Sequence, residues 1–377
     1  MREIYLDNSA TTPVLSHTID KISSVLSECH GNPSSLHKLG VKAEHELTGA
    51  RKIIASKTGA EAKEIYFTSG GTESNNMAVF GAAEAKKRLG NRIVTTAIEH
   101  PSVLEPLKVL ESRGYEVVYL KPDIYGNISE EAIFEAIDEK TILVSLMLLN
   151  NEIGSILPVP AAKKAIRRAN APALLHCDAA QGFGKVKITA ERMGIDLMSI
   201  SGHKVFAPKG VGALYVRHGV KIIPITYGGG QEKKLRPGTE STALIAGFGE
   251  AVRNLAEEQQ AYEQVSALKN QLKTELLALS GIVINSSGDA FPYIFSFSVP
   301  GVKSETMIHF LADRGIYVSG GSACSKGKKS SVLTACGLDG KLIDSAIRVG
   351  LSTLNTASDI IALIDGVKDI QKSLIRS

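Results

Sequence analysis

The chain has 377 residues, of which 44% are hydrophobic and 22% are charged, and its formal net charge at pH 7 is +4. A chain of this length can bury one large domain and a smaller one. Its basic residues are dispersed, and the one dense group (Lys326, Lys328 and Lys329) has no interleaved aromatic side chains, so we expect no nucleic-acid-binding surface.

The four cysteines exclude two further classes of protein. They are too few and too widely spaced for a disulfide framework, and none belongs to a Cys-x-x-Cys pair typical of a zinc site. The N-terminal residues lack the apolar core of a signal peptide, and the longest apolar stretch is too short to span a bilayer. We therefore expect no bound metal, no membrane association and a reducing, cytoplasmic location.

From about residue 47 to residue 216, short apolar runs alternate with helical patterns. The runs that predict strands are 64–68, 92–97, 115–120, 141–149, 173–177, 197–200 and 212–216. The intervening helices are expected at about 72–88, 101–113, 129–139 and 160–170. Strands that alternate with helices predict an α/β fold with a mostly parallel central sheet.

The pattern changes after Gly228-Gly229-Gly230. One long connecting helix is expected over about residues 242–279. Strands at 282–285, 293–299 and 316–319 and a helix near 304–314 are expected beyond it. We therefore predict a large domain formed by residues 14–250, and a smaller α+β domain formed by residues 1–13 together with 251–377.

Several polar side chains follow the predicted strands, where the loops of a parallel sheet share one edge and ligands bind. These loops contain Ser69-Gly70-Gly71-Thr72, Glu99-His100, Asn150-Asn151-Glu152, Asp178 with Gln181, and Ser201-Gly202-His203-Lys204. Taken singly, each has an ordinary explanation as a turn glycine, a helix cap or a surface lysine. Their convergence on one edge predicts a binding site.

This set matches what pyridoxal 5'-phosphate (PLP) requires. The PLP aldehyde needs a lysine amine for a Schiff base, and its pyridinium nitrogen needs a carboxylate; Lys204 and Asp178 supply them. Its phosphate needs a glycine-rich turn at a helix start, as at Ser69–Thr72, and His100 offers a flat ring to cover the cofactor. The glycine spacings of a Walker A loop and of a dinucleotide-binding fold do not occur.

Eight motifs carry a family resemblance, and they occur in order from residue 5 onward. They are YLDNSATTP (5–13), GNPSSLH (31–37), YFTSGGTESNN (66–76), EHPSV (99–103), NNEIG (150–154), HCDAAQ (176–181), SGHK (201–204) and RPGTES (236–241). Together they resemble the class V aminotransferase family, and most closely its cysteine desulfurase branch. The resemblance covers nearly the whole chain and implies the type I fold of PLP-dependent transferases and a homodimer.

The resemblance also implies roles for matching residues. Lys204 would form the Schiff base, Asp178 would contact the pyridine nitrogen, and His100 would stack on the ring. The other implied contacts are Gln181 with the phenolic oxygen, Gly71, Thr72, Ser201 and His203 with the phosphate, Thr239 from the other subunit, Asn151 with the substrate, and Arg348 with the substrate carboxylate.

The choice among PLP reactions depends on Cys324, in the run SGGSAC (319–324). This run resembles the loop that carries the sulfur-accepting cysteine of NifS/IscS-like desulfurases, which implies that Cys324 takes sulfur from L-cysteine as a persulfide and leaves L-alanine. Nearby lysines would favour its thiolate. The chain is more basic after Cys324 and ends sooner than the family pattern, so its acceptor protein, in iron–sulfur cluster assembly or tRNA thiolation, stays open.

Two other readings remain. A different enzyme of the same family, such as a selenocysteine lyase, a cysteine β-lyase or an aminotransferase, would use the same cofactor site. A catalytically silent protein that keeps the fold for partner binding would not need Lys204, Asp178 and His100 together.

Overall fold

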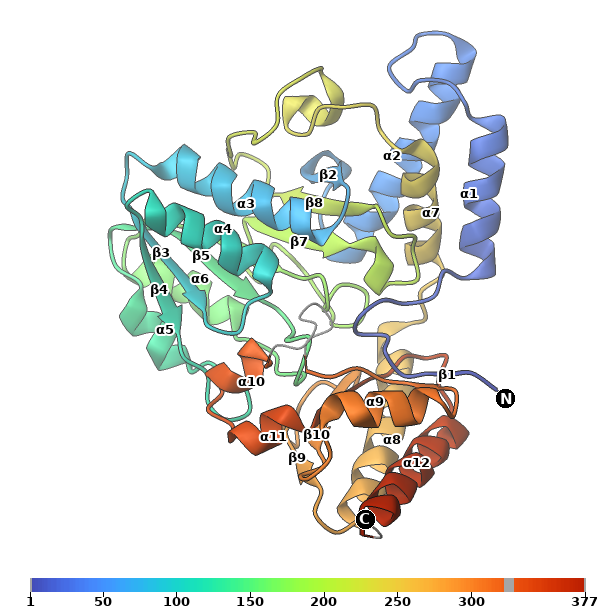
Figure 1. The fold of residues 1–377 in the computed structure, drawn as a ribbon. Coiled ribbons are helices and arrows are strands. Elements are labelled where there is room, and N and C mark those ends of the chain that lie inside the picture. The colour runs from blue at the N-terminus through green and yellow to red at the C-terminus, as the bar shows by residue number, and fades with distance from the viewer. Residues whose placement is uncertain (1, 322–328, 376–377) are drawn as a thin grey trace.

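The computed structural model describes residues 2–321 and 329–375, and within these ranges the largest sheet has seven strands (Figure 1). The strands are β2 (Ile65–Thr68), β3 (Arg92–Thr96), β4 (Glu116–Leu120), β5 (Thr141–Met147), β6 (Leu174–Asp178), β7 (Leu197–Ser201) and β8 (Gly212–Val216). They lie in the order β2-β8-β7-β6-β5-β3-β4, in which β7, β6, β5, β3 and β4 are parallel and β8 is antiparallel to both of its neighbours. The predicted α/β fold with a mostly parallel sheet is confirmed.

Helices cover both faces of this sheet, which explains why its strands are almost continuously apolar. One face packs against α3 (Gly71–Lys86) and α4 (Pro101–Ser112) through strand residues that include Ile93 and Leu143. The next residue of each strand, such as Val94 or Val144, faces the opposite side. That side packs against α2 (Lys38–Thr58), α5 (Glu130–Ala136), α6 (Val159–Arg168) and α7 (Thr242–Arg253). The helix α1 (Ser16–Glu28) lies outside α7.

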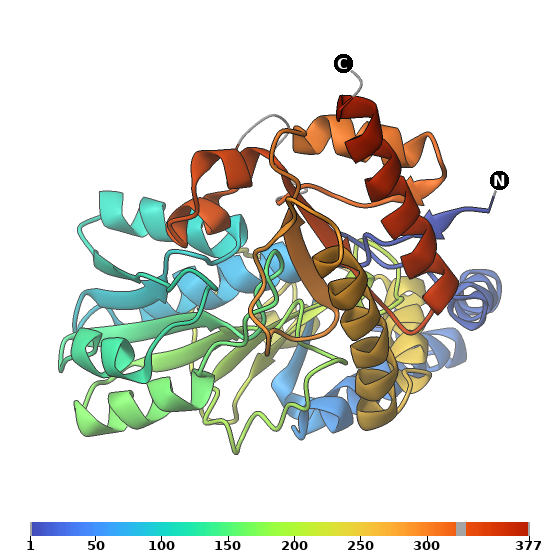
Figure 2. The same ribbon diagram turned by 90° about the horizontal axis from the view of Figure 1, so that it is seen from below.

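The C-terminal third has its own sheets and its own apolar core, seen at the bottom of Figure 1 and from below in Figure 2. The strand β10 (Ile294–Ser298) pairs antiparallel with β9 (Val283–Ile284) and β12 (Ala346–Gly350), while β1 (Ile4–Tyr5) pairs parallel with β11 (Ile316–Tyr317). The helices here are α8 (Glu258–Leu277), α9 (Ser304–Ala312), α10 (Ser331–Ala335), α11 (Gly340–Asp344) and α12 (Ala357–Ile375). None of the helices in the described ranges is both long and apolar enough to cross a membrane.

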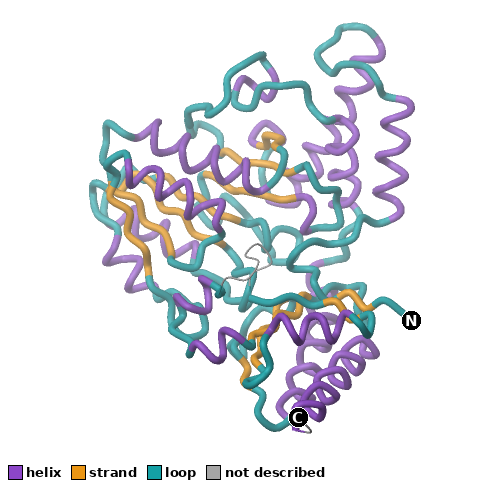
Figure 3. The backbone as a smooth tube through the Cα atoms, viewed as in Figure 1, coloured by secondary structure: helices purple, strands orange, loops and turns teal. Residues whose placement is uncertain are grey.

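The prediction of one long helix over residues 242–279 is wrong, because two helices occupy this range (Figure 3). The first ends at Arg253, where the Asn254 side chain donates back to the Glu250 carbonyl. The second begins after Glu257, whose side chain accepts a hydrogen bond from the Gln260 N–H. The break lets α7 pack against α1 and α2 while α8 packs against α12. The sequence pattern also missed α1, α2, α10, α11, α12, β1 and β12.

The N-terminal segment connects the two parts of the molecule. After β1, Asn8 N–H donates to the Gly350 carbonyl, and Thr12 N–H donates to the His203 carbonyl beyond the end of β7. The approach at β12 is so close that a Cβ atom on Gly350 would lie 2.5 Å from the Ser9 nitrogen. Residues 7–12 therefore run along the carboxyl edge of the large sheet.

Candidate active site

Lys204 lies at the carboxyl edge, on a short 3₁₀ turn (Gly202–Lys204) that directly follows β7. Its Nζ atom donates hydrogen bonds to the main-chain oxygens of Ser9, at 2.7 Å, and Ala10, at 2.8 Å. The amine is half-buried and is held between the end of a central strand and the N-terminal segment. Its position is therefore fixed by two parts of the chain that are 195 residues apart.

Asp178 is the last residue of β6, the strand next to β7, and its side chain is buried. Its Oδ2 atom accepts a hydrogen bond of 2.8 Å from Asn75 Nδ2, and its Oδ1 atom accepts one of 2.9 Å from the Ala180 N–H. Asn75, in α3, also donates to Ser102 Oγ at 2.8 Å. These contacts fix the orientation of the carboxylate at the base of the site.

His100 caps the N-terminus of α4, and its Nδ1 atom accepts a hydrogen bond from the Ser102 N–H at 3.1 Å. Burial lowers the pKa of His100; the negative charge of Asp178 opposes this effect, and the positive charge of Lys204 adds to it. The imidazole therefore favours its neutral form. It lies close enough to Asp178 and Lys204 for their charges to affect its pKa. A neutral, flat ring beside an amine and a carboxylate suits stacking against an aromatic cofactor.

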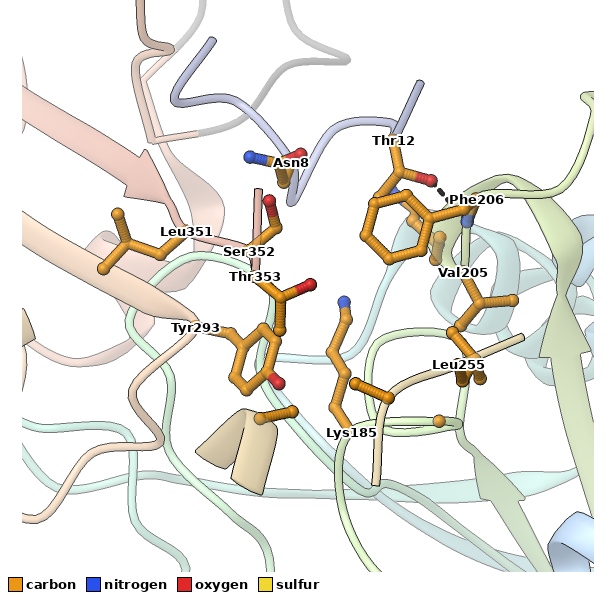
Figure 4. Close-up of a pocket in the computed structure, with 14 residues that line it drawn as sticks. Asn8, Thr12, Lys185, Val205, Phe206, Leu255, Tyr293, Leu351, Ser352 and Thr353 are labelled. Atoms are coloured by element: carbon orange, nitrogen blue, oxygen red, sulfur yellow. Dashed lines mark hydrogen bonds between the residues drawn. The ribbon is translucent and has the colours of Figure 1, made fainter. Parts of the chain in front are cut away.

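Gln181 and Lys185 lie one turn apart after β6. Gln181 Nε2 donates to the Ser9 carbonyl at 2.7 Å, and Lys185 Nζ donates to Gln181 Oε1 at 3.4 Å. Lys185 and Lys204 both line a cavity of about 30 Å³, enough for one or two water molecules. Figure 4 shows the Lys185 amine pointing into this space, between Tyr293 and Leu255. Burial and the charge of Lys204 lower the pKa of Lys185 to about 7.

The residues predicted to bind phosphate gather at one corner. The helix α3 starts at Gly71 without a side-chain cap, and a Cβ atom on Gly71 would touch the Cβ of Ser201 at 3.4 Å. Thr72 is exposed in the first turn of the same helix. His203 Nδ1 lies 3.2 Å from Thr11 Oγ1.

The charged groups that act on His203 are basic, while the Glu73 carboxylate lies in the first turn of α3. Burial lowers the pKa of His203 to about 4, and all the charged groups that act on it are basic: Lys204, Lys209, Lys185 and His100. The helix start and the basic surroundings both favour an anion.

Arg348 and Asn151 meet on another side of the site. Arg348, in β12, is 1% exposed, and its Nη1 atom donates to the Asn151 carbonyl at 3.0 Å. Its Nη2 atom donates to Asp7 Oδ1 at 3.1 Å, and its buried Nε has no hydrogen-bond partner within the described residues. The Nε–H of the guanidinium is therefore available to a further acceptor.

Thr239 is less closely connected to the rest of the site. Thr239 is exposed, on a turn whose Arg236 Nε donates to Glu73 Oε1 in α3 at 2.9 Å. Cys324 lies outside the described residues. The cysteines that are described, Cys29, Cys177 and Cys336, are all buried free thiols.

Sequence reasoning missed several residues of the site. The carbonyls of Ser9 and Ala10 hold Lys204, and Asn75 holds Asp178, yet only their presence within family motifs drew attention to them. Glu99, which precedes His100, was expected at this edge but was given no role. It is 1% exposed, and its Oε1 atom accepts hydrogen bonds from Thr96 Oγ1 and the Met147 N–H. Burial raises the pKa of Glu99 to about 8.

The residues at this edge fit PLP. They combine an amine held at a strand end, an anchored carboxylate on the adjacent strand and a neutral flat ring. They also include the start of α3, which has no side-chain cap, and His203, on which basic groups act; both suit a phosphate. In the described ranges, no group of three or more His, Cys, Asp or Glu side chains could hold a metal ion.

Comparisons with known proteins agree with this geometry. The family model described as aminotransferase class-V matches residues 4–363. A protein of Methanosarcina thermophila named cysteine desulfurase IscS is 39% identical over 377 residues, covering 99% of this chain and 93% of its own. A solved structure titled NifS-like protein has a TM-score of 0.93 at 35% identity and covers 98% of this chain and 100% of its own. Another, titled SspA in complex with cysteine, has a TM-score of 0.82 at 35% identity and covers 93% and 99%.

Proposed function

The chain belongs to the class-V aminotransferase family, and on this basis we propose that it is a PLP-dependent cysteine desulfurase, which converts L-cysteine to L-alanine and retains the sulfur as a persulfide. The observation that carries the proposal is the convergence of Lys204, Asp178 and His100 on one edge of the sheet. The relatives named cysteine desulfurase over nearly their whole length support this reaction rather than another PLP reaction.

Lys204 would hold the cofactor covalently, with Asp178 at its pyridine nitrogen, His100 on its ring and Gln181 at its phenolic oxygen. Gly71, Thr72, Ser201 and His203 would hold the phosphate. When bound, PLP supplies an electron sink for the carbon skeleton of the substrate. The Lys204 amine, once released by the substrate, would carry the proton taken from the substrate α-carbon.

Arg348 and Asn151 would orient the substrate. The Nε atom of Arg348 is buried without a partner in the described part of the chain, so a carboxylate that reached it would satisfy a donor that is costly to leave unpaired. The relative whose structure is titled SspA in complex with cysteine supports L-cysteine as the substrate.

Cys324 would supply the nucleophile. Its thiolate attacks the substrate sulfur, so that an S–S bond forms while the Cβ–S bond of the substrate breaks. The electron pair of that bond stays with carbon, which takes up a proton and becomes the methyl group of L-alanine. The sum, L-cysteine plus a thiol giving L-alanine plus a persulfide, needs no added oxidant or reductant.

We also propose that the protein acts as a homodimer in which Thr239 reaches the phosphate site of the partner. Three large apolar side chains are strongly exposed: one in α1, one just before α2 and one in the loop that precedes the Thr239 turn. These are Leu26, Leu36 and Tyr227, at 67%, 99% and 84% exposed. Their exposure supports a surface there that a second subunit covers.

Three broader proposals accompany this function. Residues 14–250 would form the cofactor-binding domain, and residues 1–13 with 251–377 the smaller one. The second apolar core, built mostly from residues 265–370, supports this division, although Val332 and Leu333 of α10 pack in the core of the larger part. The free thiols of Cys29, Cys177 and Cys336 support a reducing, cytoplasmic location. A further protein would accept the sulfur from Cys324.

The test is to incubate the purified PLP-loaded protein with L-cysteine and a thiol reductant, and to quantify alanine and sulfide together. Equal amounts of both would establish desulfuration. Pyruvate with sulfide would instead identify a β-lyase, and the absence of alanine would contradict the persulfide role of Cys324. Selenocysteine, offered in the same assay, distinguishes a selenocysteine lyase.

A further inference from the structure

A buried carboxylate outside the expected cofactor contacts lies beside the substrate end of the site. Glu152 follows Asn151 on the turn after β5 and is 3% exposed. Its Oε2 atom accepts a hydrogen bond of 2.5 Å from Ser330 Oγ. Ser330 is 5% exposed, and the same Oγ atom accepts from the Leu333 N–H at 3.0 Å, which caps α10. Glu152 therefore holds the start of α10 against the turn.

Gly321 meets the same two residues. A Cβ atom placed on Gly321 would lie 2.7 Å from Ser330 Cβ and 3.0 Å from Glu152 Oε2, so the backbone of Gly321 lies directly against this pair. Gly321 and Ser330 are thus neighbours in space, although residues 322–329 separate them in the sequence. Glu152 joins the two points of the chain between which Cys324 lies in sequence.

The turn that carries Glu152 is rigid and belongs to the expected substrate site. Asn150 Oδ1 accepts hydrogen bonds from the N–H groups of Glu152, at 2.8 Å, and Ile153, at 3.1 Å. The carbonyl of Asn151 accepts from Arg348 Nη1. One turn therefore connects the residues expected to hold the substrate with the two ends of the segment that contains the expected nucleophile.

Burying a carboxylate at this position costs free energy. Burial raises the pKa of Glu152 to about 7, while the hydrogen bond from Ser330 and the charge of Arg348 act in the opposite direction. An apolar side chain of similar size would avoid the cost of removing a carboxylate from water. What the carboxylate adds is a directional hydrogen bond to Ser330, which sets the position of Ser330 relative to the turn.

We propose that Glu152 is a positioning residue for sulfur transfer, because it binds Ser330 beside Gly321 and so fixes the two points flanking the Cys324 segment relative to the turn of Asn151. This inference rests on the proposed desulfurase function. It assigns to Glu152 no contact with the cofactor or the substrate. Its removal should therefore slow the arrival of sulfur on Cys324 without weakening the binding of PLP or of L-cysteine.

The test compares Glu152→Ala, Ser330→Ala and the conservative variant Glu152→Gln in the full-length PLP-loaded protein. The matched control is Asp344→Asn, which removes an exposed carboxylate that lies 3.5 Å from Lys329 Nζ in the same region. Three quantities are measured for each protein: PLP occupancy from visible absorbance, L-cysteine affinity from the spectral change on binding, and the single-turnover rate of persulfide formation on Cys324 by mass spectrometry.

We expect persulfide formation to slow by about 100-fold in Glu152→Ala and by at least about tenfold in Ser330→Ala, since small misplacements of a reacting group have effects of this size. Glu152→Gln keeps an oxygen that can accept from Ser330 and should recover most of the rate. PLP occupancy and cysteine affinity should match the wild type in all variants, and Asp344→Asn should match it throughout.

Wild-type rates in both alanine variants would overturn the inference, as would a loss of PLP occupancy or of cysteine affinity that accounts for the slower reaction. Gly321→Ala gives an independent check, because its methyl group would collide with Ser330 and Glu152 and should slow the same step. A wild-type protein that forms neither alanine nor persulfide would instead contradict the proposed function itself.

Discussion

Asn75 and Asp178 form a buried pair in which Asn75 Nδ2 donates a hydrogen bond of 2.8 Å to Asp178 Oδ2. The pair joins α3, whose start is expected to hold the phosphate, to the end of β6, which carries the carboxylate expected at the pyridine nitrogen. Asn75 is 1% exposed, and its Oδ1 atom has no partner within the described residues, so its amide is oriented by the two bonds that its Nδ2 donates to Asp178 and Ser102.

Replacing Asn75 by alanine should weaken PLP binding by about 10- to 100-fold, the usual effect of losing one hydrogen bond to a charged group. Titration of the apoprotein with PLP, followed by visible absorbance, measures this affinity. The substitution Asn91→Ala, at an exposed position, is the matched control. Equal affinities for Asn75→Ala and the wild type would show that Asp178 does not depend on Asn75.

Replacing Lys204 by alanine should abolish the covalent attachment of PLP. Borohydride reduction of the wild type should leave the cofactor on the peptide that contains Lys204, as peptide mass spectrometry will show. Lys185→Ala is the informative control, because Lys185 lines the same small cavity and its lowered pKa makes it a competing amine. Cofactor found on Lys185 in the wild type would refute the role given to Lys204.

Replacing Cys324 by serine should leave the visible spectrum and L-cysteine binding intact but reduce alanine formation by at least about 100-fold, because the nucleophile is lost. Coupled measurement of alanine and protein-bound sulfur checks this expectation. Cys336→Ser is the control, since that thiol is buried and burial raises its pKa to about 12. Undiminished sulfide release by Cys324→Ser would end the persulfide mechanism.

Replacing Glu99 by glutamine should change how stability depends on pH. The pKa of Glu99 is about 8 in the folded protein against an ordinary value of 4.5, so between these values the folded state holds a proton that the unfolded state has lost. The contribution of Glu99 to wild-type stability therefore falls as pH rises from about 4.5 to about 8. A glutamine does not titrate, so its contribution to stability does not depend on pH, and it keeps an oxygen that can accept from Thr96 and Met147.

The stability of Glu99→Gln relative to the wild type should accordingly increase across this pH range. Urea unfolding at the two ends of the range, with the same cofactor loading, provides the measurement. A difference that stays constant with pH would mean that Glu99 does not titrate between the folded and unfolded states as expected.

The central sheet and the edge that carries His100, Asp178 and Lys204 could be predicted because their signals are local. Each strand is a short apolar run, and each polar residue follows its strand within a few positions. The contacts that complete the site are not local. Ser9 and Lys204 are 195 residues apart, and Glu152 and Ser330 are 178 apart, so no sequence periodicity brings them together.

The prediction of one helix over residues 242–279 failed for a different reason. Residues 242–279 keep a helical pattern throughout, and the ends at Asn254 and Glu257 depend on single side-chain caps. The capping residue Glu257 is a common helix-interior residue, so it gives no stop or start signal by type. The different packing partners of the two helices, α1 and α2 against α12, require the chain to turn there.

The pairing of β1 with β11 imposes an order on the folding of the newly made chain. Ile4–Tyr5 are synthesised before their strand partner, Ile316–Tyr317, from which more than 300 residues separate them. The central sheet is complete in sequence by Val216 and can begin to fold on the nascent chain. The carbonyls of Ser9 and Ala10 therefore gain their β-sheet anchor only after the central sheet is complete in sequence, and the pocket around Lys204 is completed after that sheet.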